Sequence, residues 1–145
     1  MTKSTMKAIT IHQPYAQLIA DGHKRYETRH WTTSYRGPIA IHVGKKWDRH
    51  LTREAESLIK RFPDLPSYLQ TGFHFGKILV ACKLVAIHRV EDIRDSLSPL
   101  ERAVGNYADG RYAWELEIIK HPEKPIPARG QQGIWTWEYT PEPTS

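Results

Sequence analysis

The sequence contains a single cysteine and no long apolar run. With only Cys82 among 145 residues, the chain cannot form an intramolecular disulfide. Cys82 lies in the apolar run I-L-V-A-C, which predicts a buried core residue. The apolar runs are far shorter than the ~20 residues that span a membrane, and the first seven residues lack the apolar segment of a signal peptide. These absences predict a cytoplasmic protein of a reducing compartment, with no membrane partner.

Motifs of several enzyme classes are also missing. Eight histidines occur, but we find no C-x-x-C, no H-E-x-x-H and no close histidine pair with the spacing of metal ligands. There is also no G-x-S-x-G, no P-loop and no dinucleotide-binding fingerprint. His12 and His42 could meet in a cleft, although the favoured interpretation of each is a hydrogen-bonded structural histidine. We therefore expect no metal and no cofactor.

Positive charge is unevenly distributed along the chain. Lysine and arginine outnumber aspartate and glutamate by 21 to 16, which gives a formal net charge of +5. Residues 21–54 contain eight basic and four acidic residues and carry +4, whereas the chain from Glu115 onward contains three basic and five acidic residues and carries −2. A local positive field favours partners that bear phosphate. Ordinary solubilising charge is the alternative that stays open.

The hydrophobic pattern predicts one α+β domain at residues 7–139, between frayed ends at 1–6 and 140–145. Alternating apolar residues indicate about six short strands, and helical spacing indicates two or three helices inserted between them. A helix that starts at Pro14 should end at Gly22, and Ser98 to Glu101 fits a capping box. The expected strands are residues 7–11, 26–31, 38–43, 75–90, 110–119 and 133–137; the expected helices are 14–20, 48–62 and 96–105, with a further helical turn at 66–71 and a loop at 122–127.

Three motifs follow one another in the first third of the chain: I-H-Q-P-Y-A at 11–16, G-H-K-R-Y-E-T-R at 22–29 and Y-R-G-P-I-A-I-H at 35–42. Together they resemble the start of an ASCH domain, whose hallmark is G-x-K-x-x-E-x-R. The first and third motifs are especially similar to the branch found in a eukaryotic transcriptional coactivator. Segments 112–116 and 130–135 resemble the closing strands of the family, so the resemblance covers most of the chain.

The resemblance implies a small β-barrel related to PUA domains, which bind RNA, with a cleft lined by residues 22–29. Some family members are proposed nucleic-acid binders and others are described as ribonucleases. One branch hydrolyses N4-acetylcytidine with a lysine, a threonine and a glutamate, and its threonine occupies the position of Glu27. A carboxylate cannot replace a hydroxyl nucleophile, although it can act as a general base for water. Thr28 should point to the opposite face of its strand, so this departure counts against that hydrolysis here.

Lys24 and Glu27 decide between binding and catalysis. Lys24 is a phosphate contact if it is exposed, and a base or nucleophile if burial lowers its pKa. Lys24 and Glu27 are the catalytic residues if the protein is an enzyme. Glu27 has a second interpretation as the internal ion-pair partner of Lys24, Arg29 or Arg36.

Aromatic residues beside the basic residues favour nucleic acid as the partner. Trp31 and Tyr35 are candidates for stacking on bases, whereas Trp114 and Trp135 are assigned to the core. The expected nucleic-acid-binding residues are His12, Gln13, Lys24, Arg25, Arg29, Trp31, Tyr35, Arg36, Lys45, Lys46 and Arg49.

Three functions stay open at this stage. The first is a module that binds RNA, another single-stranded nucleic acid or a modified nucleotide through a basic cleft. The second is a small cofactor-free hydrolase of a modified nucleoside or of RNA. The third, suggested only by the coactivator resemblance, is a module that binds a protein partner.

Overall fold

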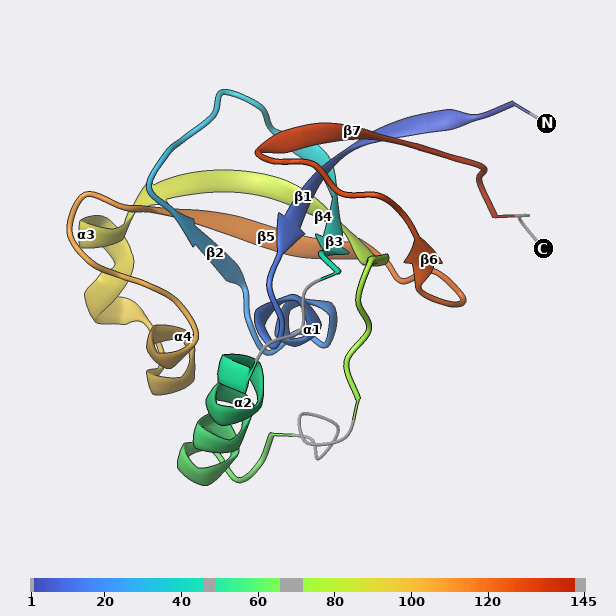
Figure 1. The fold of residues 1–145 in the computed structure, drawn as a ribbon. Coiled ribbons are helices and arrows are strands. Elements are labelled where there is room, and N and C mark those ends of the chain that lie inside the picture. Colours follow the sequence, from blue (N-terminus) through green and yellow to red (C-terminus); the bar gives the residue numbers. More distant parts are fainter. Residues whose placement is uncertain (1, 46–48, 66–71, 143–145) are drawn as a thin grey trace.

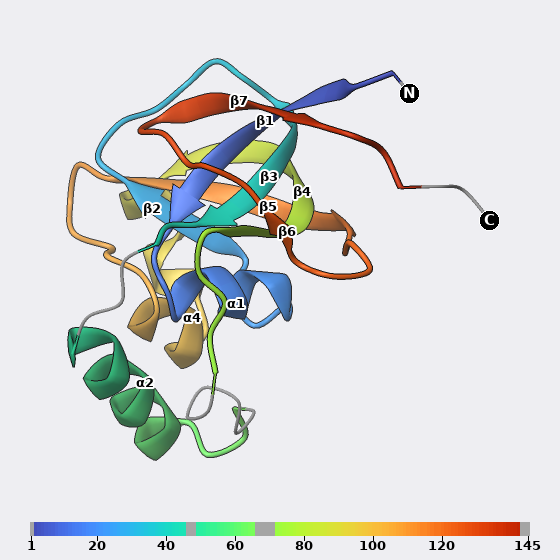
Figure 2. The ribbon, with the colours of Figure 1, turned by 45° about the vertical axis from the view of Figure 1, so that its right-hand side comes forward.

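The computed structural model describes residues 2–45, 49–65 and 72–142. One mixed β-sheet dominates them, and most of the helices lie below it in the view of Figure 1, while one short helix flanks its left end; Figure 2 turns the view by 45°. No helix in these ranges is long and apolar enough to span a membrane. The strands are β1 (Ser4–Ile11), β2 (Tyr26–Arg29), β3 (Gly37–Val43), β4 (Lys77–Arg89), β5 (Tyr112–Lys120), β6 (Ile126–Pro127) and β7 (Ile134–Tyr139); the helices are α1 (Tyr15–Ala20), α2 (Arg49–Arg61), α3 (Val90–Ile93) and α4 (Pro99–Ala103), with a 3-10 turn at Arg94–Ser96.

The sheet is open rather than closed. Its strand order is β2-β5-β4-β3-β1-β7, and β6 pairs with β4. β1 and β3 run parallel, while the other neighbouring strands are antiparallel. Within the described ranges β2 pairs only with β5, and β7 only with β1. The predicted α+β class is confirmed, but the predicted closed barrel is wrong. Alternation reveals which face of a strand is buried and carries no information on whether the outermost strands meet.

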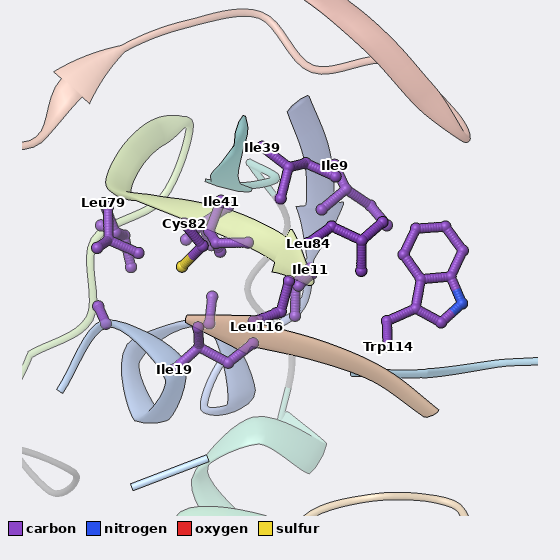
Figure 3. Close-up of a cluster of buried hydrophobic side chains, with 14 residues drawn as sticks. Ile9, Ile11, Ile19, Ile39, Ile41, Leu79, Cys82, Leu84, Trp114 and Leu116 are labelled. Carbon is purple, nitrogen blue, oxygen red and sulfur yellow. The ribbon is translucent and has the colours of Figure 1, made fainter. Parts of the chain in front are cut away.

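Irregular pairing bends the sheet around its core. The register of β4 against β5 shifts between Ala81 and Cys82 and again between Leu84 and Ala86, and the register of β3 against β4 shifts beside His42. Such bulges increase the local twist. As a result β1 and β3 lie on one side of the core, and β5 with α1 lies on the other, as Figure 3 shows.

The main core is formed by the alternate residues of these strands. Ile39, Ile41 and Val43 share the buried face of β3, as their spacing predicted. Cys82 is fully buried, which confirms its predicted place. Trp114 is also buried, whereas Ile118, which alternation along a strand places on the same face, is 38% exposed near the end of β5. A buried Leu or Ile contributes about 1.5–3 kcal/mol, so this cluster is the principal support of the sheet.

Helix α2 packs through the apolar stripe that its spacing predicted. Ala55 and Leu58 are buried against Leu18 of α1 and Val104, just after α4. The stripe therefore links α2 to the helical side of the molecule rather than to the sheet. The expected helical turn at 66–71 lies outside the described residues.

Helix α4 begins with half of the predicted capping box. The Ser98 hydroxyl accepts a hydrogen bond from the amide of Glu101 at 3.1 Å, which satisfies one free helix donor. The Glu101 carboxylate does not return to Ser98 and instead accepts from the amide of Arg25 at 2.7 Å. The cap residue was thus predicted correctly, and the side chain expected to complete the box joins α4 to the segment before β2.

Several element boundaries differ from expectation. β1 begins at Ser4 because residues 4–6 pair with 139–137 of β7. The expected loop at 122–127 contains the short strand β6. α1 begins at Tyr15, one residue later than expected, and the peptide bond between Gln13 and Pro14 is cis. The extension of β1 and the presence of β6 arise from pairing with distant segments, which local composition does not encode.

The segment before β7 covers the outer face of the sheet. Nε2 of His42 lies 2.8 Å from the carbonyl oxygen of Ala128 and donates to it, while Nδ1 lies 3.0 Å from the Thr10 hydroxyl and accepts from it. Trp135 donates its indole N–H to the same hydroxyl at 3.2 Å. Both ring nitrogens are thus satisfied, and burial lowers the pKa of His42. The interpretation of His42 as a structural histidine is confirmed.

Replacing Gly130 by alanine should destabilise the fold, because the new Cβ would lie 2.5 Å from Cε1 and 2.7 Å from Nδ1 of His42. The His42 ring is held on both nitrogens and cannot move aside freely. Overpacking of this kind costs about 1–3 kcal/mol. The matched control is Gly44→Ala, whose Cβ would meet only Thr10 Cγ2 at 3.6 Å. Urea unfolding measures both variants, and equal midpoints would contradict this close approach.

Candidate functional site

The end of helix α1 fixes the position of Lys24. The amide of His23 donates to the carbonyl of Leu18 at 2.9 Å and that of Gly22 to the carbonyl of Ile19 at 3.1 Å, which is a Schellman ending. Gly22 has a φ of +81°, a left-handed conformation that glycine adopts without a steric penalty. The predicted role of Gly22 is therefore confirmed. The amide of Lys24 also donates to Leu18 at 3.1 Å, so its backbone is tied to the helix.

The Lys24 side chain lies in the interior. The residue is 2% exposed, and its Nζ donates to the carbonyl of Val104 at 2.6 Å. Nζ also lies 5.7 Å from the centroid of the Tyr15 ring. Burial lowers the pKa of Lys24, and the negative charges of Glu27 and Glu101 oppose this shift. Of the two interpretations of Lys24, a buried amine with a lowered pKa fits this position, and a solvent-exposed phosphate contact does not.

A second buried polar group faces the same region. Glu101 is 6% exposed, and burial raises its pKa against the effects of the Arg25 amide and the charge of Lys24. Its Oε2 and the hydroxyl of Tyr107 are buried without a hydrogen-bond partner among the described residues. Burial also raises the pKa of Tyr107. The protonation equilibria of Lys24 and Glu101 are therefore both shifted toward the neutral forms, although the charge of each residue stabilises the charged form of the other.

Glu27 and Arg29 form an ion pair on one face of β2. Residues two apart on a strand share a face, and Glu27 Oε2 accepts from Nε of Arg29 at 3.0 Å and from its Nη2 at 2.8 Å. Arg29 Nη2 also donates to the carbonyl of Thr10 at 2.9 Å, at the end of β1. The predicted internal ion pair of Glu27 is confirmed, with Arg29 as its partner. The other carboxylate oxygen, Oε1, receives no hydrogen bond within the described ranges.

A cavity of about 280 Å³ opens beside this pair. It lies between the end of β1, the start of α1, β2 and the residue that precedes β5, and it is partly lined by aromatic rings. Trp31 stands against the core, since its ring meets that of Trp114 edge to face with centroids 4.8 Å apart. The wall combines aromatic, acidic and basic side chains. The lining residues are Thr10, Ile11, His12, Tyr15, Glu27, Thr28, Arg29, His30, Trp31 and Arg111.

Six of the lining residues were not predicted as site residues, and two of these, Tyr15 and Arg111, are long polar side chains held by hydrogen bonds. Tyr15 donates its hydroxyl to Glu54 of α2 at 2.9 Å, and its pKa is raised by burial and by that hydrogen bond. Arg111 donates from Nε to the carbonyl of Asn106 at 3.1 Å and from Nη2 to that of Thr28 at 3.2 Å. Tyr15 belongs to the first sequence motif and could have been included on that ground. Arg111 has no local signal, because only the pairing of β2 with β5 brings it to the cavity.

The other predicted site residues are dispersed. Of the expected nucleic-acid-binding residues, His12, Arg29 and Trp31 line the cavity. Gln13 is buried, and its amide side chain accepts from the amide of Gln17 and donates to the carbonyl of His74. Among the described residues, no three His, Cys, Asp or Glu side chains gather where they could hold a metal ion.

Most of the remaining cations face elsewhere. Arg25 lines a separate hollow of about 290 Å³ together with Glu115 and Glu117. Arg36 donates from Nη1 to the carbonyls of Thr33 and Tyr35 at 2.8 Å each and so holds its own turn. The hydroxyl of Tyr35 donates to the carbonyl of Pro38, and Lys45 packs beside Gly76. Lys46 and the side chain of Arg49 lie outside the described residues.

Replacing Lys24 by methionine should change how stability depends on pH. In the folded wild type Lys24 releases its proton at a lower pH than its ordinary value of 10.5. The unfolded chain then binds more protons than the folded chain, so wild-type stability rises with pH between the lowered pKa and 10.5. Lys24→Met removes this contribution, and wild type should gain stability relative to the variant as the pH rises toward 10.5. The control is Lys83→Met on the exposed side of β4. Parallel pH profiles of wild type and Lys24→Met in urea unfolding would contradict the buried amine.

Comparison with known families adds one finding to this geometry. The model of the ASCH domain family matches residues 9–126. No curated protein matches the chain. The matched range starts in β1 and ends in β6, and it includes every residue that lines the cavity as well as Lys24 and Glu101. The chain therefore belongs to the ASCH domain family.

Proposed function

We propose that the protein binds a single-stranded nucleic acid, in particular RNA or a modified nucleotide, through the cavity beside Glu27 and Arg29. The observation that carries this proposal is the presence of an aromatic wall, a carboxylate and two guanidinium groups around one cavity of about 280 Å³. Aromatic rings stack on any base, and the polar groups match the edge of a base and its phosphate. Family membership agrees with this proposal, because the ASCH resemblance implies a relation to RNA-binding PUA domains.

The aromatic wall supports stacking without reorganisation. The Trp31 ring packs against Trp114, and the Trp31 carbonyl accepts from the Trp114 indole N–H at 3.3 Å. Tyr15, on the neighbouring wall, is held by its hydrogen bond to Glu54. Side chains that are ordered before binding lose little conformational entropy when a ligand arrives. Trp31 is therefore the side chain on which we expect a base to stack.

The polar groups offer both kinds of hydrogen bond. Oε1 of Glu27 is an acceptor that Arg29 does not use, and a carboxylate accepts hydrogen bonds from exocyclic amino groups of bases. Nη1 of Arg29 is a donor that neither Glu27 nor Thr10 engages. An acceptor beside a donor suits a base edge that presents an amino group next to a ring nitrogen or carbonyl.

A second candidate function is hydrolysis of a modified nucleoside or of RNA. The observation that favours it is the buried Lys24, whose pKa is lowered and whose charge interacts with Glu27. In this mechanism Glu27 accepts a proton from water as the water attacks the carbonyl or phosphoryl group, and returns that proton to the leaving nitrogen or oxygen as its bond to that group breaks. Lys24 does not line the cavity and is engaged by Val104, so it would act on Glu27 through its charge rather than on substrate. This geometry favours binding over catalysis.

Replacing Trp31 by alanine should weaken binding of a fluorescently labelled single-stranded RNA about 5- to 100-fold, since stacking on one aromatic ring contributes about 1–3 kcal/mol. Trp31→Phe should retain most of the affinity. The wild-type affinity should fall as salt rises, because phosphates release counterions on binding. Tyr139→Ala, which removes a ring outside this cavity, is the control. Fluorescence anisotropy at low salt measures all four proteins, and no RNA binding by wild type would refute the proposal.

The hydrolytic candidate predicts turnover that depends on Glu27. Purified protein is incubated with N4-acetylcytidine and, separately, with single-stranded RNA, and products are separated by chromatography. Glu27→Gln keeps the size of the side chain but cannot accept the proton, so turnover should fall at least about 100-fold. Lys24→Met should lower the rate as well. Absence of wild-type turnover, or full activity in Glu27→Gln, would exclude this mechanism.

A further inference from the structure

The two arginines of the cavity differ in how their charge is balanced. Arg29 is paired with Glu27 through two nitrogens. Arg111 contacts only the carbonyl oxygens of Asn106 and Thr28, and no carboxylate of the described residues lies within ion-pair distance of it. Carbonyl groups orient a guanidinium group but do not neutralise its charge. Arg111 therefore brings an unbalanced positive charge to the cavity wall.

The Arg111 guanidinium is also held in place before any ligand binds. Its Nε and Nη2 are both engaged, at 3.1 and 3.2 Å, which leaves Nη1 without a partner among the described residues. The Arg111 backbone is fixed as well, because its carbonyl accepts from the amide of Val90 at 3.1 Å. Arg111 precedes Tyr112, the residue of β5 that pairs with Arg29 of β2. A fixed fork with free N–H groups is suited to bind an anionic oxygen.

The other cations near this region are less suited to that role. Lys24 is buried and donates to Val104. Arg25 lines a different hollow, beside two glutamates. Arg36 holds its own turn. The cations predicted from the hallmark motif are thus less suited to bind an anion than Arg111, which lies far from that motif in the sequence.

We propose that Arg111 binds a phosphate group of the ligand, so that the cavity takes a nucleotide and discriminates against the neutral nucleoside. This inference rests on the proposed nucleic-acid-binding function and names the charged group that the site recognises. Arg111 and Trp31 line the same cavity, so one ligand can stack its base and place its phosphate at Nη1. Charge-assisted hydrogen bonds of this kind are worth about a 10- to 100-fold change in affinity.

The test compares ligands with and without phosphate. Isothermal titration calorimetry at low salt measures binding of the four ribonucleosides, their 3′- and 5′-monophosphates, inorganic phosphate and a single-stranded hexaribonucleotide. Wild type should bind at least one monophosphate about 10- to 100-fold more tightly than its nucleoside. Arg111→Gln should remove this preference, and Arg111→Lys, which keeps the charge, should restore part of it. The control is Arg102→Gln on the exposed side of α4, and thermal melting verifies that each variant is folded.

The outcomes separate this inference from the function on which it rests. Loss of the phosphate preference in folded Arg111→Gln, with recovery in Arg111→Lys, supports the assignment. Nucleotide and RNA binding that is unchanged in Arg111→Gln overturns the role of Arg111 and leaves the nucleic-acid-binding function intact. Equal wild-type affinity for nucleoside and nucleotide also overturns the inference alone. Failure of wild type to bind any of these probes overturns both.

Discussion

The guanidinium group of Arg29 connects parts of the fold that backbone pairing leaves apart. In the sheet, β5, β4 and β3 separate β2 from β1, yet Arg29 of β2 reaches the Thr10 carbonyl at the end of β1 at 2.9 Å. This contact is possible only because the sheet bends back on itself. The same side chain orients Glu27 through two nitrogens. The cavity, its acidic group and its position between two strands thus depend on one arginine.

Local features of the site could be predicted from the sequence, because they depend on residues close together in the chain. The αL residue after α1, the Ser98 cap and the pairing of Glu27 with Arg29 follow from spacing of two to four residues. The burial pattern of β3 follows from alternation in the same way. Each of these features is decided by geometry within one turn or one strand.

Features that depend on the path of the whole chain could not be predicted. The acceptor of the Lys24 ammonium group is the carbonyl of Val104, 80 residues away. Arg111 joins the cavity through the pairing of β2 with β5. Barrel closure was expected from the family resemblance and is not observed. In each case the missing information is which distant segments meet, and no local pattern carries it.

In the structure, part of the positive charge of segment 21–54 is buried or balanced by nearby acidic side chains. Lys24 is inside the molecule, the charge of Arg29 is balanced by Glu27, and Arg25 lies near two glutamates. Among the described residues of this segment, these three charges therefore do not contribute to a continuous track of the kind that follows a nucleic-acid backbone. Such an arrangement is compatible with the proposed recognition of one nucleotide at one point.

The burial of Cys82 offers an independent view of the fold that holds this site. Cys82 is the chain's only cysteine, it is fully buried in β4 between β3 and β5, and burial raises its pKa to about 12. Because alkylating reagents require an accessible thiolate, the rate at which the native protein is alkylated reports how often its central strand opens.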